Sequence, residues 1–254
     1  MHELIAFLNS LPPEAISLAM IFMAYGGALF MMRAFGLNGL IAFVIVAIIG
    51  ANIQVIKTAQ FSVFTHPVAL GTELFASTYL VMDIITEFYG AARARKVIWI
   101  GFACQLLFSA FMILLLGYHP VDTTAGSDAA VVESALSTIL QPQPGLVAAG
   151  MISYLISQNL DVTIYSWMKR QTHGGSLWLR NQFSNVAAAL IDNTIFSVFA
   201  WEIFAEKPVP IDSLIFTYIL GTFWIRVIIS AGDLPFMYLS RKIFAHSGEK
   251  AAQA

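Results

Sequence analysis

Carboxylates placed inside long apolar runs, or at their ends, are the residues of this sequence that could do chemistry. In VMDIITEFYG, residues 81–90, Asp83 and Glu87 lie four residues apart and therefore on one face of a helix. Two carboxylates this close in a low-dielectric medium repel each other, so one of them can hold a proton. The pair could thus form a substrate, proton or sodium site, with Asp83 the deeper and better candidate. The alternative is a helix end at the membrane interface, where Glu87 pairs with Arg93 or Arg95.

A second polar group occurs in the apolar segment SYLISQNLDVTIY. Tyr154, Gln158, Asp161 and Tyr165 recur at helical spacing and form one stripe, with Asn159 beside it. An amide, an acid and two aromatic rings on one face could line a pocket for a planar polar ring. The alternative is interhelical hydrogen bonding, which polar side chains commonly provide in membrane helices.

The segment RNQFSNVAAALIDNTIF carries a third group. Asn181, Asn185, Ala188 and Asp192 cluster on one side of a helix with 3.6 residues per turn. Asp192 falls near the middle of the apolar run, where a charged side chain is costly and usually faces the interior of a helix bundle. We therefore expect Asp192 to be functional rather than structural.

Arg226 and Asp233 share the face of a further apolar segment with Ser230. An intramembrane ion pair between Arg226 and Asp233 could brace the bundle. Alternatively, Arg226 neutralises an acid on another helix and is released from it during transport.

The segment GANIQVIK adds two amides and a cation, Asn52, Gln54 and Lys57, at the end of an apolar run. Gln54 and Lys57 share a face of this helix, whereas Asn52 points elsewhere, and Lys57 could simply extend to the surface.

Part of the Asn52 segment recurs later in the chain. The pattern Asn, apolar, Gln or Asp, Val begins at Asn52 and again at Asn159, and an Asp follows in the next helix each time, Asp83 and Asp192. Three spans separate the two copies, so their membrane orientations would be opposite. The sequence thus suggests an inverted repeat, in which substrate sites lie near the membrane midplane between the two halves.

The composition requires that these side chains sit in a membrane. The chain has 254 residues, of which 58% are hydrophobic and 11% charged, and its mean hydropathy is +0.76. We predict an all-α, polytopic helix bundle forming a single domain over 1–254, with an ordered core of about 12–242 and a disordered tail. Seven stretches are long enough to span a bilayer, or six if one is re-entrant; they are 14–34, 37–57, 67–87, 97–117, 145–167, 183–203 and 212–232. The last could continue past Asp233 and Pro235 as a kinked helix to about residue 240.

The loops support a count of seven spans. With seven, ten of the twelve loop and tail cations fall on one side. The positive-inside rule then places the N-terminus outside and the C-terminus in the cytoplasm. The longest loop would be outside, and its segment 129–140 predicts a short amphipathic helix that ends before Pro142, either a surface lid or a gate over a site.

Several of these segments also carry a resemblance to a known family. ANIQVIKTAQF, VMDIITEFYGAARARKVIWIGF, SYLISQNLDVTIYSWMK, LWLRNQFSNVAAALIDNTIF and DLPFMYL resemble the bacterial queuosine precursor transporter family, earlier grouped as a vitamin uptake transporter family. The similarity runs from about residue 40 to 240. It implies import of 7-deazaguanine bases, in the 7-cyano or 7-aminomethyl form, across the bacterial inner membrane for the synthesis of a modified tRNA base. It also implies that the working residues are those in the matching blocks: Asn52, Lys57, Asp83, Glu87, Arg180, Asn181 and Asp192.

The residue chemistry fits such a ligand. A guanine-like ring has an N–H and NH₂ edge that a carboxylate accepts, a carbonyl to which amides or Arg can donate, and flat faces that suit aromatic rings. We expect substrate contacts from Asn52, Gln54, Asp83, Gln158, Asn159, Asp161, Asn185 and Asp192. We expect coupling or gating roles for Lys57, Glu87, Arg180, Arg226 and Asp233, and an aromatic pocket from Tyr89, Tyr154, Tyr165 and Phe196.

Other function classes fit less well. The sequence has no Walker motif, no H-E-x-x-H or G-x-S-x-G motif and no Cys/His cluster, so we expect neither an enzyme nor a metal site nor a cofactor. It has no basic patch for nucleic acid. The expected partners are a small-molecule substrate and membrane lipid, with a homodimer possible. The main alternative is a transporter of another vitamin or heterocycle, either alone or as the binding subunit of an ATP-driven complex.

Overall fold

The chain folds into an all-α bundle with one very short hairpin of strands. The computed structural model describes residues 2–62, 68–119, 124, 126–140, 144–205 and 207–246. The expected disordered tail therefore lies largely outside the described residues. In chain order the elements are α1 His2–Asn9, α2 Pro13–Gln54, β1 Thr58–Ala59, β2 Val68–Ala69, α3 Thr72–Phe88, α4 Ala91–Leu116, α5 Asp128–Leu140, α6 Pro144–Gln171, α7 Leu177–Val198, the π-helical turns η1 Phe199–Ile203 and η2 Ser213–Gly221, α8 Thr222–Ala231 and α9 Leu234–His246.

Helix α2 contains two of the predicted spans, because it reverses direction at Gly36. Its 42 residues would extend about 63 Å if straight, roughly twice the thickness of a bilayer core. Gly36 has φ 58° and ψ −135°, a conformation that side chains with a Cβ rarely adopt. A Cβ built at Gly27 would lie 3.6 Å from the ring of Phe43, sixteen residues further on, which a straight helix could not allow.

The hydrophobic pattern of the surface is that of a membrane protein. Large apolar side chains point outward on α2, α4 and α8; exposed fractions are, for example, 65% at Phe30, 60% at Phe111 and 62% at Trp224. Many polar side chains of α3, α6 and α7, by contrast, are buried among the helices. This inversion is expected when lipid replaces water as the solvent, since polar groups must then find partners inside the protein.

Four helical segments are long and apolar enough to cross a membrane in the described part of the chain: Pro13–Gln54, Ala91–Leu116, Leu177–Ile203 and Ser213–Ala245. Because the first of these folds back on itself, it accounts for two of the expected spans. Helix α3 has only 17 residues and α6 carries several polar and charged side chains. The count of seven spans therefore stays a prediction.

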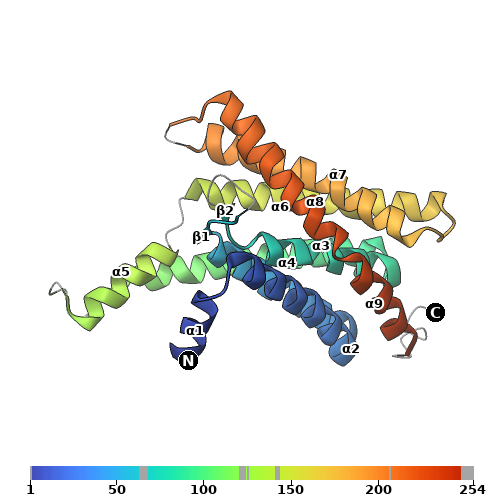
Figure 1. Ribbon diagram of the computed structural model, residues 1–254, viewed down its shortest axis with the longest axis horizontal. Coiled ribbons are helices and arrows are strands. Elements are labelled where there is room, and N and C mark those ends of the chain that lie inside the picture. The colour runs from blue at the N-terminus through green and yellow to red at the C-terminus, as the bar shows by residue number, and fades with distance from the viewer. Residues whose placement is uncertain are drawn as a thin grey trace.

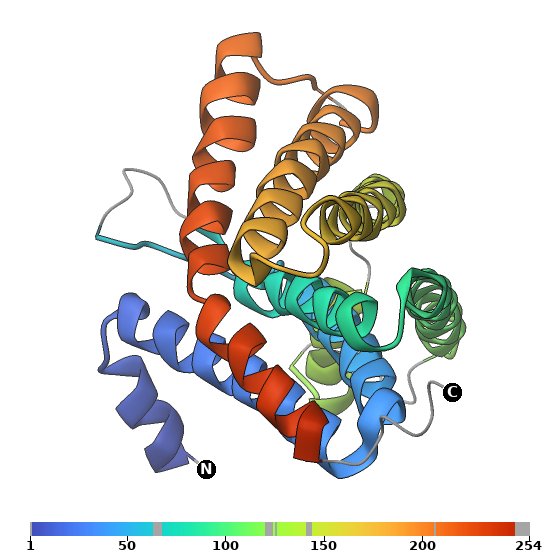
Figure 2. The ribbon, with the colours of Figure 1, turned by 90° about the vertical axis from the view of Figure 1, so that its right-hand side faces the viewer.

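The arrangement of the helices groups the basic loops at one end of the molecule. In Figure 1 the α3–α4 turn, the α6–α7 turn and the end of α9 all lie toward the right, whereas α5 projects from the opposite end. Figure 2 looks along the bundle and shows α7 and α8 packed on one side of α3 and the two halves of α2 on the other. The ends predicted to be cytoplasmic thus lie together, while their side of the membrane remains a prediction.

Two predictions about helix ends are confirmed. Helix α5 forms within the long loop and ends at Leu140, before Pro142. The last span continues beyond Asp233 as α9, which starts at Leu234 and reaches His246 after a break at Gly232. The two-residue strands β1 and β2, which the sequence did not predict, pair antiparallel with Thr58 opposite Ala69.

The inverted repeat remains a prediction, although two local features agree with it. Asn52 and Asn159 each donate a hydrogen bond to the backbone carbonyl four residues earlier, at 2.9 and 2.7 Å. In addition, α2 packs extensively against α3 as α6 packs against α7.

Candidate functional site: buried acids between α3, α6, α7 and α8

The predicted stripe on α6 is buried along its whole length. Tyr154, Gln158, Asp161 and Tyr165 have exposed fractions of 1% or less. Gln158 donates its amide to the Thr78 hydroxyl of α3 at 2.9 Å, which ties the two helices together beside the acids. The stripe therefore faces other helices and not lipid.

Asp83 of α3 meets Asp161 of α6 inside the bundle. Both carboxyl groups are fully buried and lie close enough to interact directly. Neither oxygen of either carboxyl group has a hydrogen-bond partner in the described part of the chain. The Ser184 hydroxyl of α7 faces Asp161 but donates to the backbone carbonyl of Asn181. Asp83 thus meets an acid of another helix, while Glu87 of its own helix lies within electrostatic range of it.

Asp192 of α7 is neutralised by an arginine from the next helix. Arg226 of α8 forms a salt bridge with one carboxylate oxygen, and the Ser157 hydroxyl donates to the other at 2.9 Å. The Tyr79 hydroxyl of α3 donates to Ser157 at 3.0 Å and extends this network to a third helix. Of the two alternatives for Arg226, the structure has the pairing with an acid on another helix and not the pairing with Asp233.

Asp233 occupies the break between α8 and α9 and is held by amides. Asn181 and Asn185 of α7 donate to its two oxygens, each at 3.0 Å, and Gln182 donates at 3.4 Å. The side-chain oxygens of Asn181 and Asn185 are buried and have no partner among the described residues. The cluster predicted on α7 thus anchors a helix break, and it leaves two acceptors unused.

Glu87 forms the densest ionic contact in the described part of the chain. Arg180 donates to it at 2.7 Å, Arg241 at 3.1 Å and the Tyr165 hydroxyl at 3.1 Å, while Lys169 lies 3.2 Å away. These groups come from α6, α7 and α9, so one carboxylate of α3 joins four helices at the end of the bundle.

The expected partners of Glu87, Arg93 and Arg95, are not those the structure shows. Both follow Glu87 closely in sequence, but Gly90 separates α3 from α4, and Arg95 instead donates to Thr163 of α6 at 3.2 Å. The prediction was wrong because it considered only neighbours along the chain.

Asn52, Gln54 and Lys57 lie away from the acids. A Cβ built at Gly71, just before α3, would lie 3.2 Å from the Cβ of Gln54. Asp83 comes twelve residues later, which is about 18 Å along the helix. Lys57 is exposed and Asn52 bonds within its own helix. The structure therefore does not bring these residues to the carboxyl pair.

The expected aromatic pocket does not form around one point. Tyr154 directs its hydroxyl to the Ile98 carbonyl at 3.4 Å, whereas Tyr165 belongs to the Glu87 contact. Tyr89 makes an edge contact with Phe244 near the end of α3. Phe196 lies one turn beyond Asp192 and is half-buried.

The space between the helices is small. One cavity lies between α3, α7 and α8, with a volume of about 20 Å³. That is room for one water molecule and too little for a base. Tyr79, Asn185, Arg226, Ser230 and Asp233 contribute to its lining. The polar face predicted on the last span thus borders this cavity.

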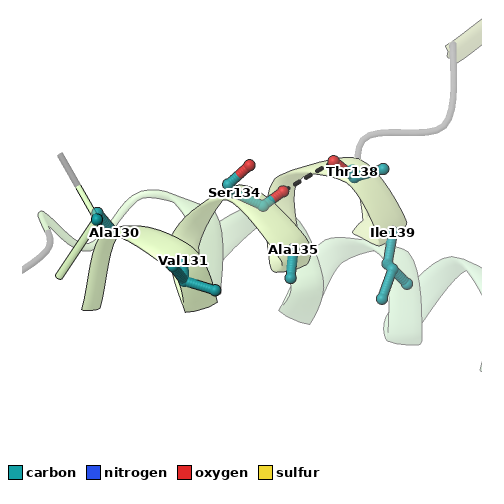
Figure 3. Close-up of a pocket in the computed structure, with 7 residues that line it drawn as sticks. Ala130, Val131, Ser134, Ala135, Thr138 and Ile139 are labelled. Atoms are coloured by element: carbon teal, nitrogen blue, oxygen red, sulfur yellow. Dashed lines mark hydrogen bonds between the residues drawn. The ribbon is translucent and has the colours of Figure 1, made fainter. Parts of the chain in front are cut away.

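A second hollow lies far from the acids, along the surface of α5. Figure 3 shows its lining by one face of that helix, including Ala130, Ser134 and Thr138, with the Thr138 hydroxyl donating to the Ser134 carbonyl at 2.8 Å. None of the residues predicted for the site lines it.

Sequence reasoning missed several residues that complete these contacts. Thr78, Tyr79, Ser157, Gln182 and Arg241 all bond to a predicted residue or to its partner. Ser157 directly precedes Gln158, and Gln182 lies between the two asparagines, so their polarity inside apolar segments was a usable signal. Arg241 offered none, because it reaches Glu87 from a helix 154 residues away.

Comparison with known proteins identifies the family of this chain. The model of the family described as "Putative vitamin uptake transporter" matches residues 69–240. The chain belongs to this family. A Bacillus subtilis (strain 168) protein named "Probable queuosine precursor transporter" is 31% identical over 212 residues, which cover 83% of this chain and 87% of the relative. No solved structure matches the chain. Membership of the family makes this chain a multi-pass membrane transporter, and its buried acids lie within the matched residues.

Proposed function

We propose that the protein imports queuosine precursors, the 7-deazaguanine bases in their 7-cyano or 7-aminomethyl form, across the bacterial inner membrane. The family and the name of the Bacillus subtilis relative support this substrate class. The N-terminus would lie outside and the C-terminus in the cytoplasm, on the side of the basic loops.

The observation that carries the proposal is a surplus of buried acceptors. Asp83, Asp161, Gln158, Asn181 and Asn185 all have side-chain oxygens that are buried and without a donor in the described residues. A buried polar atom without a partner is costly, so such a set is suited to a ligand rich in N–H groups. A 7-deazaguanine base carries N–H groups on both rings and an exocyclic NH₂ group.

Asp83 is the residue we assign to the guanine-like edge. A carboxylate accepts two parallel hydrogen bonds from adjacent N–H and NH₂ groups, as it does from an arginine. Asp192, the other candidate, already uses both oxygens for Arg226 and Ser157. The Gln158 side-chain oxygen, on the neighbouring helix, is available for a further N–H group of the base.

A base cannot enter this conformation. The cavity beside Asp233 has room for about one water molecule, and Asp83 and Asp161 are fully buried. Binding therefore requires α7 and α8 to move relative to α3, as expected of a transporter that exposes one site alternately to the two sides of the membrane.

Uptake by cells tests the proposal. Cells unable to make 7-deazaguanine bases would be given the labelled base with and without this protein, and queuosine in their tRNA would be measured. Queuosine should appear in the tRNA only when the protein is present. A lack of queuosine in cells that contain the protein would overturn the proposal.

Asp83→Asn provides the test of the site. This variant should abolish uptake while the amount of folded protein in the membrane stays unchanged. Asp128→Asn on the exposed face of α5 is the matched control and should transport normally. Near-normal uptake by Asp83→Asn would remove Asp83 from the site.

A further inference from the structure

In the described part of the chain, each buried carboxyl group outside one contact has a cation or a hydrogen-bond donor, including Glu73, which accepts a hydrogen bond from the Ser17 hydroxyl. Glu87 faces three cations, Asp192 faces Arg226, and Asp233 receives three amide donors. Asp83 and Asp161 receive no donor from the described residues although both are fully buried. Among the described residues, the buried carboxyl groups with neither a cation nor a hydrogen-bond donor are therefore those of Asp83 and Asp161.

No cation of the described residues forms a salt bridge with either acid of the pair. Asp233 and Glu87 lie within electrostatic range of Asp83, and Tyr165 is the nearest titratable group on α6 besides Asp161. Tyr79 of α3 lies within range of Asp161. The buried core that α2, α3 and α4 share includes apolar side chains such as Leu40 and Ile98.

The two arginines inside the bundle, Arg180, which is fully buried, and Arg226, which is largely buried, already have partners. Arg180 binds Glu87, Tyr165 and a backbone carbonyl, and Arg226 binds Asp192. Both therefore already have the counter-charge that a buried arginine needs, and neither donates to Asp83 or Asp161.

Two further unpartnered groups flank the carboxyl pair. The Gln158 side-chain oxygen lies three residues before Asp161 on α6, and the Thr86 hydroxyl lies three residues after Asp83 on α3. Both side chains are more than nine-tenths buried, and each shares a helix face with one of the acids. The site is therefore a set of oxygens from two helices rather than two acids alone.

We propose that Asp83 and Asp161 together bind one transported proton, which couples import of the base to the proton gradient. This inference rests on the proposed function, because the coupled solute is the base. A single proton shared between two facing carboxyl groups replaces their repulsion by a hydrogen bond, as in the paired carboxyl groups of aspartic proteases. The protonated pair keeps one negative charge, so Asp83 can still accept hydrogen bonds from the N–H edge of the base.

A proton fits the site better than a metal ion. A proton needs no space, and neither of the two cavities described above is lined by Asp83 or Asp161. In the described part of the chain, no three acidic, histidine or cysteine side chains are placed to hold a metal. In each cycle one proton would bind from the outside together with one base, and both would be released into the cytoplasm.

Transport in proteoliposomes separates this inference from the proposed function. Exchange of labelled for unlabelled 7-deazaguanine base at equal pH measures transport itself. Accumulation under an inside-alkaline gradient of one pH unit, with the membrane potential clamped to zero, measures coupling. One proton per base should concentrate the base up to about tenfold. Exchange without any response to the pH gradient would refute proton coupling but would be consistent with the proposed import of the base. Accumulation that follows a sodium gradient would have the same meaning.

Variants locate the proton. Asp161→Asn should show an accumulation ratio near one under the same gradient, whatever rate of exchange it retains, because Asp83 then has no second carboxyl group with which to share the proton. Asp128→Asn should accumulate the base as the unmodified protein does. Accumulation by Asp161→Asn equal to that of the unmodified protein would contradict the assignment.

Infrared spectroscopy tests the pair even if the protein transports no such base. The purified protein should show the carbonyl stretch of a buried, protonated carboxyl group at neutral pH, and the band should titrate at higher pH. The band should be missing from the Asp83→Asn/Asp161→Asn double variant and present in Asp128→Asn. A spectrum without the band in the unmodified protein, or with the same band in the double variant, would refute a shared proton.

Discussion

Removal of the Glu87 carboxylate should destabilise the protein far more than removal of either of its exposed cationic partners. Glu87→Gln leaves the Arg180 side chain, which is 0% exposed, without its counter-charge. Breaking a buried ion pair by removing one partner costs about 3–5 kcal/mol. Lys169 and Arg241 are 36% and 40% exposed, so each contributes only about 0–1 kcal/mol. Their removal leaves Glu87 with the buried arginine in place.

The assay is unfolding of the purified protein in detergent, followed by tryptophan fluorescence. The free energy of unfolding should fall by about 3–5 kcal/mol in Glu87→Gln and by no more than about 1 kcal/mol in Arg241→Ala or Lys169→Ala. Arg180→Gln should lie between them, because the other two cations still face Glu87. A loss below about 1 kcal/mol in Glu87→Gln, or a loss in Arg241→Ala as large as in Glu87→Gln, would show that the buried arginine does not depend on this carboxylate.

Three further predictions use other features. Asp192→Asn and Arg226→Gln should each reduce the yield of folded protein, because each leaves the other charge without its partner. The double variant should recover part of the yield. Equal yields in the two single variants and the double variant would contradict the pairing. Gly36→Ala should lower the free energy of unfolding by about 1–3 kcal/mol, because Gly36 has a positive φ. Gly26→Ala is the control and should lower it by nothing measurable, because nothing lies within 4 Å of the new Cβ. Similar losses in the two variants would mean that the reversal of α2 does not need glycine. Gln105→Leu should leave the unfolding midpoint unchanged or raise it, because the Gln105 side-chain oxygen is buried without a partner in the described residues; a clear decrease would indicate a partner for it in the folded protein.

Helical periodicity predicted which faces of the helices are buried. The α6 stripe from Tyr154 to Tyr165 and the α7 cluster from Asn181 to Asp192 both face the interior. The reason is physical: within one helix, the sequence spacing fixes the direction of each side chain, and lipid excludes polar groups from the outer face.

Contacts between helices could not be predicted in the same way. Asp83 was expected beside Glu87 and lies against Asp161, and Arg226 had several acids within its possible reach. Which side chains meet depends on how the helices are packed and shifted relative to each other, and the spacing within one helix contains no information on that. For the same reason Asn52 and Asp83, which belong to the same sequence pattern, lie at different depths of the bundle.

The break at Asp233 has a mechanical consequence. The carboxylate interrupts the α8–α9 rod and is clamped by Asn181, Gln182 and Asn185, three amides of a single helix. Bending at this break away from α7 would remove hydrogen bonds from a buried carboxylate. Bending that carries α7 along would keep all of them. Helix α9 can therefore change its orientation without losing these hydrogen bonds only if it moves together with α7. Such a movement would shift Arg241 and Arg180 together relative to Glu87.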